Sequence, residues 1–261
     1  MRELSPGWAT DLAVLQHGGS TVEDRDDHLV VRTPHNPDFH WGHSLFVTDA
    51  DSVDDALRWV TTFQTTFPQA TWVAIGLARM PDDADAWTDL GLDLELDDVL
   101  TTRTLPRQTP PPTGYRVRRL SGPDWAQQVF RAMADNERTG EYEAVSHERF
   151  VRAQTDARRA LSDRDVAAYF GAFAGDRLVA DLGIVRCGTT ARYQNVGTDE
   201  EHRGRGLASH LLGVAARWAH DWGCDRWVIV TESTNSAGRV YRRAGFESDT
   251  GNAQAYRRPP R

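Results

Sequence analysis

The spacing of apolar residues in the second half of the chain predicts alternating strands and helices. Residues 193–198 form a β-type run, and the segment after residue 206 has the period of an amphipathic helix. The apolar face of that helix consists of Leu207, Leu211, Ala215 and Trp218. A continuous apolar run at residues 226–231 predicts a buried strand.

Upstream of these elements, the pattern predicts a strand, two helices and a hairpin. Ser146 is the expected cap of the second of these helices. The turn of the hairpin is expected at Gly175-Asp176-Arg177. The predicted elements are a strand at residues 115–120, helices at residues 124–134 and 146–162, and hairpin strands at residues 166–174 and 178–186.

The first half of the chain contains a weak internal repeat of the second half, at an offset near 155 residues. Residues 72–76 resemble residues 227–231, and residues 90–93 resemble residues 244–247. A helix is expected at about residues 52–66, ahead of the first of these segments, as a helix precedes its counterpart in the second half.

A proline-rich linker separates two halves of opposite charge. Residues 104–114 contain four prolines, which hold a chain extended and stiff. Residues 1–105 carry 6 Arg and 19 acidic residues, a net charge of −13, whereas residues 106–261 carry 24 Arg and 19 acidic residues, a net charge of +5. We expect an N-terminal domain at residues 1–105, a linker at residues 106–114 and a second domain at residues 115–261, which suits a polyanionic cofactor.

The most informative segment is the loop that leads from the strand at residues 193–198 into the following helix. Gly204 and Gly206 lie at the predicted N-terminus of the helix, where free backbone N–H groups and the helix dipole favour an anion such as a pyrophosphate. No Gly-Lys-Ser/Thr follows, so the loop is not a P-loop. A dinucleotide-binding fingerprint would need a third glycine and a later acidic residue, and both are missing. The remaining alternative is an ordinary tight turn.

Two segments of the second half resemble signatures of the GNAT superfamily of N-acetyltransferases. The loop sequence Arg203-Gly204-Arg205-Gly206-Leu207-Ala208 is similar to the pattern R/Q-x-x-G-x-G/A. Residues 235–246 are similar to the second signature, N-x-x-A-x-x-[LV]-Y-x-x-x-G-F. The resemblance covers residues 115 to about 257. It implies an α/β (α+β) GNAT fold, with a mixed central sheet flanked by helices and a second, smaller GNAT-like domain at the N-terminus.

The resemblance implies that acetyl-CoA is the co-substrate and that no metal is needed. The pyrophosphate would lie on the loop amides of Arg203, Gly204, Arg205, Gly206, Leu207 and Ala208. The pantetheine arm would pair with a strand edge at Val196, Gly197 and Thr198, and the amide near Val196 would stabilise the oxyanion. A further contact falls on Asn235, six residues before Tyr241, or on Thr234, where the commoner spacing of seven would place it.

Three side chains are candidates for acid–base catalysis. Tyr241 matches the usual general acid of the family, and its alternative role is a packed core residue. Glu232, after the buried strand, and Asp181, among apolar neighbours, are the candidate general bases. Either carboxylate has the alternative role of a structural hydrogen-bond acceptor.

Within this resemblance, we interpret the first half as a degenerate, non-catalytic GNAT-like domain. Residues 48–52 stand where the glycine loop should be, but they contain no glycine and carry two carboxylates. Trp87 stands where Tyr241 does in the second half. The alternative is an unrelated α/β segment.

Composition argues against several other classes of protein. The net charge of −8 disfavours nucleic-acid binding, and no apolar run approaches the length of a membrane span. The N-terminus lacks the apolar core of a signal peptide, and Cys187 and Cys224 cannot form a disulfide framework. We therefore expect a cytoplasmic protein. If residues 39–47 form a strand, His40 and His43 point to opposite faces, which disfavours a metal site.

The expected function is transfer of an acetyl group from acetyl-CoA to the primary amine of a small molecule or peptide, by direct attack in a ternary complex. An acidic wall from the first half would attract a cationic acceptor. The alternatives are a non-catalytic acyl-CoA-binding regulatory protein and an interaction protein without cofactor. The sequence leaves open the acceptor, the general base, the acyl-chain length and whether the chain forms a homodimer.

Overall fold

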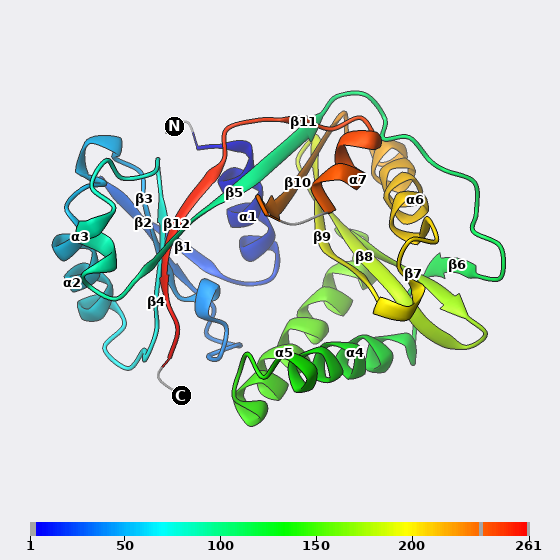
Figure 1. Cartoon of the computed structure of the whole chain (residues 1–261), viewed down its shortest axis with the longest axis horizontal. Helices are drawn as coiled ribbons and strands as arrows, with labels where there is room; N and C mark the ends of the chain where they lie inside the picture. The colour runs from blue at the N-terminus through cyan, green and yellow to red at the C-terminus, as the bar shows by residue number, and fades with distance from the viewer. Residues whose placement is uncertain (1–3, 235–236, 260–261) are drawn as a thin grey trace. The chain divides into compact units, whose positions relative to one another are not determined.

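A computed structural model describes residues 4–234 and 237–259 (Figure 1). The chain divides into two compact units, which are described separately. Unit 1 comprises residues 1–98 and 250–261, and unit 2 comprises residues 99–249. Among the described residues, no helix combines the length and apolar character that a membrane crossing requires.

Unit 2 contains a mixed sheet whose neighbouring strands run in the order β5-β10-β9-β8-β7-β6, with β11 paired to the other edge of β5. Strands β6 to β9 pair antiparallel, and β10 runs parallel to β9. The sheet is therefore mixed, as expected. Its strands are β5 (Asp93–Thr102, of which residues 99–102 belong to unit 2), β6 (Arg116–Arg119), β7 (Ala167–Ala174), β8 (Arg177–Cys187), β9 (Thr190–Thr198), β10 (Arg226–Glu232) and β11 (Glu247–Ser248).

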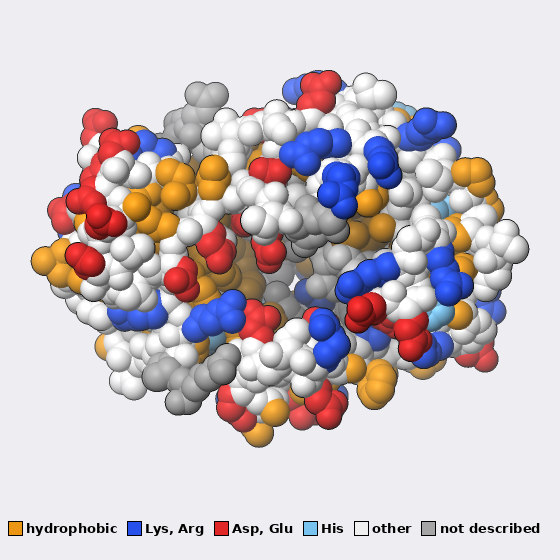
Figure 2. Space-filling view, in the orientation of Figure 1, with side chains coloured by type: hydrophobic (Ala, Val, Ile, Leu, Met, Phe, Trp, Pro, Cys, Tyr) orange, Lys and Arg blue, Asp and Glu red, His pale blue; other side chains and the backbone are white. Residues whose placement is uncertain are grey.

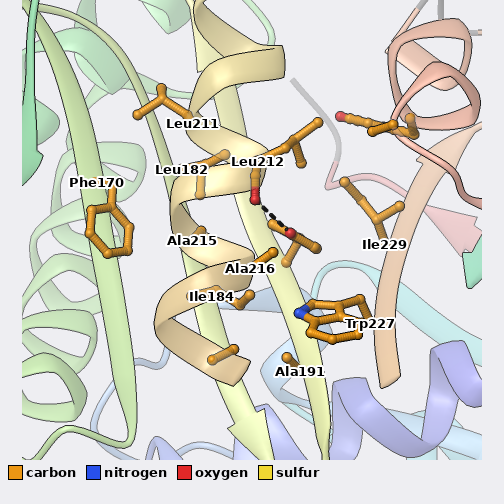
Figure 3. Close-up of a cluster of buried hydrophobic side chains, with 14 of the residues drawn as sticks. Phe170, Leu182, Ile184, Ala191, Leu211, Leu212, Ala215, Ala216, Trp227 and Ile229 are labelled. Carbon is orange, nitrogen blue, oxygen red and sulfur yellow. Dashed lines mark hydrogen bonds between the residues drawn. The ribbon is translucent and has the colours of Figure 1, made fainter. Parts of the chain in front are cut away.

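Helices cover both faces of this sheet (Figure 1). Helix α6 (Leu207–Asp221) packs on one face, and α4 (Asp124–Thr139) and α5 (Ala144–Asp163) pack on the other. Helix α7 (Ala237–Arg243) follows β10. Figure 3 shows the core beneath α6, where Ala215 and Ala216 face Leu182 and Ile184 of β8. Small side chains on the helix let its backbone approach the sheet closely.

In unit 1, neighbouring strands pair in the order β1-β2-β3-β4-β12-β5, again with both parallel and antiparallel pairs. Strand β3 runs parallel to β4, and helix α2 lies between them in sequence. The elements of unit 1 are β1 (Thr21–Arg25), β2 (His28–Arg32), β3 (Ser44–Val47), β4 (Val73–Leu77), β12 (Asn252–Arg257), residues 93–98 of β5, α1 (Pro6–His17), α2 (Ala56–Thr66) and α3 (Asp85–Thr88). Short 3-10 helices precede β3 and α2, at His40–Gly42 and Ala50–Ser52.

The two halves of the sequence exchange strands. In unit 1, β12 from the end of the chain lies between β4 and β5 and pairs antiparallel with both. In unit 2, residues 99–102 of β5 lie between β10 and β11. Unit 1 thus includes residues 250–261 from the end of the sequence, and unit 2 begins at residue 99. The position of a strand in the sequence does not determine which strands it pairs with, because pairing requires a neighbouring strand whose edge is still unpaired.

Three local details differ from the predictions. Helix α5 begins at Ala144 and is capped by Glu143, whose carboxylate accepts from the amides of Val145 and Ser146, so Ser146 is not its cap. The strand expected at residues 39–47 begins only at Ser44, after a 3-10 turn. The helix expected at residues 52–66 begins at Ala56. In each case, a local side-chain or turn hydrogen bond competes with the regular element.

Candidate functional site

The end of β9 is open on one side. The described ladder between β9 and β10 covers only residues 190–192 and 226–228, so the two strands separate beyond Arg192. On its other side, β9 stays paired with β8 up to Thr198. Among the described pairings, residues 193–198 therefore have no parallel partner, and this strand edge can pair with an extended ligand.

A β-bulge interrupts β9 within this open segment. Gly183 of β8 pairs with Gln194 and Asp181 pairs with Gly197, so an extra residue of β9 is accommodated between these pairs. Asn195 has a φ of +54°, in the left-handed region that non-glycine residues rarely adopt. Bulges re-aim backbone groups next to functional sites. Here the bulge changes the direction of the backbone at Val196, the predicted oxyanion donor.

The glycine loop follows β9 through the 3-10 turn Glu200–His202. Gly204 and Gly206 have φ values of +74° and +79°, and a Cβ at either position would meet nothing within 4 Å. The glycines are thus needed for backbone conformation, and the space beside them is open. Within the described part of the chain, the amides of residues 204–208 donate to no backbone or side-chain acceptor. No side chain caps α6, so its N-terminus can accept an external anion.

The two arginines of the loop are exposed and bond within it. Arg203 Nε donates to the carbonyl of Thr198 at 3.2 Å, and Arg205 Nη2 donates to the carbonyl of Glu201 at 3.2 Å. Leu207 is buried in the core beneath α6, whereas Ala208 is half-buried. Side chains of the loop therefore anchor it, and its backbone groups remain available.

Tyr241 lies on α7 and is 4% exposed. Burial raises the pKa of its phenol to about 12, so the hydroxyl is protonated throughout the physiological range. Its hydroxyl has no hydrogen-bond partner among the described residues. The ring packs into the core of unit 2.

The other predicted site residues near β10 lie in different environments. Glu232 ends β10 and is exposed, without an ion pair to any described residue. Thr234 is also exposed. Asn235 lies outside the described residues.

Asp181 is a buried ion-paired carboxylate, and its partners were not predicted from the sequence. It is 3% exposed within β8. Its Oδ2 accepts from Gln128 Nε2 at 2.7 Å, and its Oδ1 pairs with Arg131. Arg131 also donates from Nε to Asp199 Oδ1 at 2.8 Å. A charged residue amid an apolar strand signals a buried partner, but α4 is 50 residues away in sequence, so the partner could not be named.

The histidines of unit 1 do not converge on a metal. His40 stacks on Trp72 at a centroid distance of 4.3 Å and bonds to the hydroxyl of Tyr256 at 2.6 Å. Burial lowers the pKa of His40 to about 4, and it also lowers the pKa of His43. Across the described residues, no group of three or more His, Cys, Asp or Glu side chains is arranged to hold a metal ion.

Unit 2 is thus an α+β domain with a half-open strand that leads into a glycine loop. Residues 130–246 match the family model described as the acetyltransferase (GNAT) family. This segment of the chain is therefore similar to the GNAT family. No curated protein matches the sequence of the chain.

The fold of the whole chain is shared with solved structures of low sequence identity. A functionally unknown conserved protein from Staphylococcus epidermidis has a TM-score of 0.66 at 10% identity, covering 93% of this chain and 95% of that one. A GCN5-related N-acetyltransferase from Kribbella flavida has a TM-score of 0.66 at 16% identity, covering 95% of each chain. A tandem GNAT protein from the clavulanic acid biosynthesis pathway has a TM-score of 0.56 at 14% identity, covering 95% of this chain and 88% of that one. The TM-scores show that these chains share a fold with this one despite the low sequence identity.

Proposed function

We propose that the protein is an acetyl-CoA-dependent N-acetyltransferase, with the cofactor bound by unit 2 between β9 and the N-terminus of α6. One observation carries this proposal. The unpaired end of β9 leads directly into a glycine loop whose amides are unoccupied. The strand edge can pair with an extended amide-containing arm, and the loop can hold a pyrophosphate. Acetyl-CoA contains both groups in this order.

The proposed chemistry is attack of a neutral amine on the thioester carbonyl within a ternary complex. Backbone groups of Val196 and Thr198 orient the arm, and the amide of Val196 donates to the developing oxyanion. Tyr241 donates its proton to the departing thiolate. Burial raises the pKa of Tyr241 to about 12, so the phenol carries its proton when the thiolate departs.

Glu232 is the better of the two candidate bases. It is exposed at the end of β10, where water can relay a proton from the attacking amine. Asp181 also belongs to the site, but both of its oxygens already accept hydrogen bonds, from Gln128 and Arg131. We therefore propose Glu232 as the base and a structural role for Asp181.

The proposed acceptor is the primary amine of a small molecule or peptide. Figure 2 shows acidic side chains crowded on the surface of unit 1, whereas Arg side chains predominate over the part of unit 2 that carries α6 and α7. The net charges of the two sequence halves, −13 and +5, agree with this distribution. Acidic side chains attract cationic acceptors, and basic ones attract the phosphates of the cofactor.

The deciding experiment is a calorimetric titration with acetyl-CoA of the native chain and two glycine variants. Gly206→Glu places a carboxylate where the pyrophosphate would bind. Gly223→Glu is the matched control, since Gly223 follows the same helix, has a φ of +89° and also faces open space. Both variants strain the backbone by about 1–2 kcal/mol, so any difference between them reports on the anion site.

We expect saturable one-to-one binding that Gly206→Glu abolishes and Gly223→Glu preserves. No binding by the native chain would refute the enzyme proposal and favour an interaction protein. Saturable binding without turnover of any amine in a broad panel would favour the acyl-CoA-binding regulatory protein. Two equivalents bound would show that unit 1 also retains a cofactor site.

A further inference from the structure

We infer that Arg131 is a positioning residue that holds the C-terminal end of β9, and with it the entry to the glycine loop, from helix α4. The inference rests on the proposed function, because the positioned segment is the one that would bind the thioester arm. Arg131 belongs to neither GNAT-like signature in the sequence. Its role follows from its contacts.

Arg131 joins three elements of unit 2 through two carboxylates. Its Nη1 pairs with Asp181 inside β8, and its Nε donates at 2.8 Å to Asp199, the residue that follows β9. The side chains of Arg131, Asp181 and Asp199 are 16%, 4% and 27% exposed. These ion pairs are therefore screened less by water than a surface pair, and they hold their geometry more firmly.

The end of β9 needs such a restraint because it lacks a strand on one side. Beyond Arg192 the described ladder to β10 ends, and the bulge interrupts the pairing with β8. The amide of Asp199 donates to the carbonyl of Val179 at 2.9 Å, and its carboxylate meets Arg131. Asp199 is thus held through both its backbone and its side chain.

The guanidinium also lies close to the strand backbone. A Cβ added to Gly197 would be 3.7 Å from Arg131 Nη2 and 3.8 Å from Asp181 Oδ1. The ion pair therefore packs beside the bare backbone of Gly197, at the first residue after the bulge. Movement of Arg131 would change the support of the strand where the thioester arm is proposed to pair.

The chemistry of the contact requires an arginine. A guanidinium presents several N–H groups in a fixed plane and can meet two carboxylates at once, whereas an ammonium is a point charge on a flexible stem. Gln128 completes the arrangement by donating to the other oxygen of Asp181 at 2.7 Å. The buried carboxylate of Asp181 thus anchors Arg131.

The test removes the contact between Arg131 and Asp199. Asp199→Ala removes the contact to β9 but keeps the buried pair of Arg131 and Asp181, whose loss would risk unfolding. Asp199 makes no side-chain cap in the following 3-10 turn, so the variant leaves that turn intact. Asp199→Asn keeps an oxygen acceptor for Arg131 and serves as the conservative variant.

Two arginine variants serve as controls. Arg138→Gln removes an exposed ion pair with Asp135 on the same helix. Arg177→Gln removes an exposed side chain that lies 3.6 Å from Asp199, 3.6 Å from Glu201 and 3.3 Å from His202, and so tests whether these exposed contacts restrain the segment instead of Arg131. If Arg131 is the positioning residue, neither control variant changes hydrogen exchange at the end of β9.

The primary measurement is hydrogen exchange at the amide of Asp199, which donates to the carbonyl of Val179, with acetyl-CoA affinity and the separate kcat and KM values alongside. Asp199→Ala should speed exchange there by about tenfold, the loss expected for one charge-assisted hydrogen bond, while exchange in β7 stays native. Affinity for acetyl-CoA should fall by a similar factor, mainly through KM. Asp199→Asn should restore most of both losses.

Unchanged exchange in Asp199→Ala would overturn the inference, whatever the affinity. An affinity loss without faster exchange would mean that Asp199 contacts the ligand directly, which also overturns it. Faster exchange in a protein that binds no acetyl-CoA would support the positioning role and refute the proposed function. The two proposals can therefore fail independently.

Discussion

The two strand-to-helix junctions of this protein share a topology but differ in what occupies their backbone amides. One joins β3 to α2 in unit 1, and the other joins β9 to α6 in unit 2. In both, the strand runs parallel to the strand that follows the helix, and a 3-10 turn precedes the helix. The second junction then passes through two glycines with positive φ, and its helix has no side-chain cap.

At the junction between β3 and α2, side-chain carboxylates accept hydrogen bonds from nearby backbone amides. Asp55 caps α2 by accepting from the amide of Arg58 at 3.2 Å. Asp49 accepts from the amide of Asp51 at 3.3 Å. Asp54 accepts from the amides of Asp82 and Asp83 at 2.6 and 3.2 Å. The comparison shows that topology alone does not make an anion site, because intramolecular carboxylates can satisfy the same donors and repel a phosphate.

A second difference lies on the short helix that follows in each unit. Trp87 of α3 and Tyr241 of α7 are both buried, at 0% and 4% exposure. The indole N–H of Trp87 has no partner among the described residues, and it cannot act as a proton donor near neutral pH. Tyr241 has an ionisable hydroxyl. We therefore propose that unit 1 is a degenerate, non-catalytic relative of unit 2.

The largest expected effect is on the chemical step. Tyr241→Phe should lower kcat by about 10²–10⁴-fold, because the leaving thiolate loses its general acid, with little change in acetyl-CoA affinity. Steady-state kinetics and calorimetry together measure both quantities. Trp87→Phe in unit 1 is the matched control and should leave kcat native. An equal loss of kcat in both variants would contradict the proposed difference between the units.

An intermediate effect is expected on the stability of unit 1. Asp55→Ala removes the cap of α2 and should lower the free energy of unfolding by about 1 kcal/mol, as measured by denaturant titration. Acetyl-CoA affinity should not change. Asp51→Ala in the preceding turn is the control, since the Asp51 carboxylate caps no helix amide. A loss of acetyl-CoA affinity in Asp55→Ala would mean that the junction between β3 and α2 contributes to cofactor binding.

The smallest effect is a pH dependence confined to the first junction. The hydrogen bond from Arg79 holds the pKa of Asp54 below its ordinary value. The carboxylate therefore contributes stability above about pH 4, and this contribution is lost as the pH falls through the lowered pKa. The amide NMR shifts of Asp82 and Asp83 should titrate with that low midpoint. Arg79→Gln should raise the midpoint.

The amides of residues 204–208 are the internal comparison for this titration, because no carboxylate accepts from them in the described structure. They should show no matching transition. A shared midpoint in both junctions would indicate a global acid transition rather than release of the Asp54 contacts.

Much of unit 2 could be predicted from the sequence. The strands at β6 to β10 and the helices α4 to α7 lie close to their predicted ranges, because each carries a strong local period of apolar residues. The glycine loop could be predicted as well, since Gly204 and Gly206 have the positive φ that only glycine adopts easily. The prediction placed the start of α5 two residues too late, because Glu143 rather than Ser146 caps the helix.

The partners of buried charges could not be predicted in the same way. Asp181 was singled out because it stands among apolar residues, but nothing in the local pattern pointed to Arg131 or Gln128 on α4. Contacts between residues 50 or more positions apart depend on how helices pack on the sheet, as in the pair of Arg131 and Asp181. The sequence could therefore single out Asp181 as unusual, but it could not decide whether Asp181 is a general base or a structural partner of Arg131.

The sequence by itself determined most of the local elements of unit 2, the glycines of the loop and the resemblance of the second half to the GNAT family, because periodicity, glycine conformation and motif spacing are local properties. Only the tertiary structure decided that β12 completes the sheet of unit 1 and that β5 serves both units. It also decided that the pairing of β9 with β10 ends at Arg192 and that Arg131 pairs with Asp199, the residue that follows β9. Strand pairing and buried ion pairs join residues far apart in the chain, so their energies depend on three-dimensional packing.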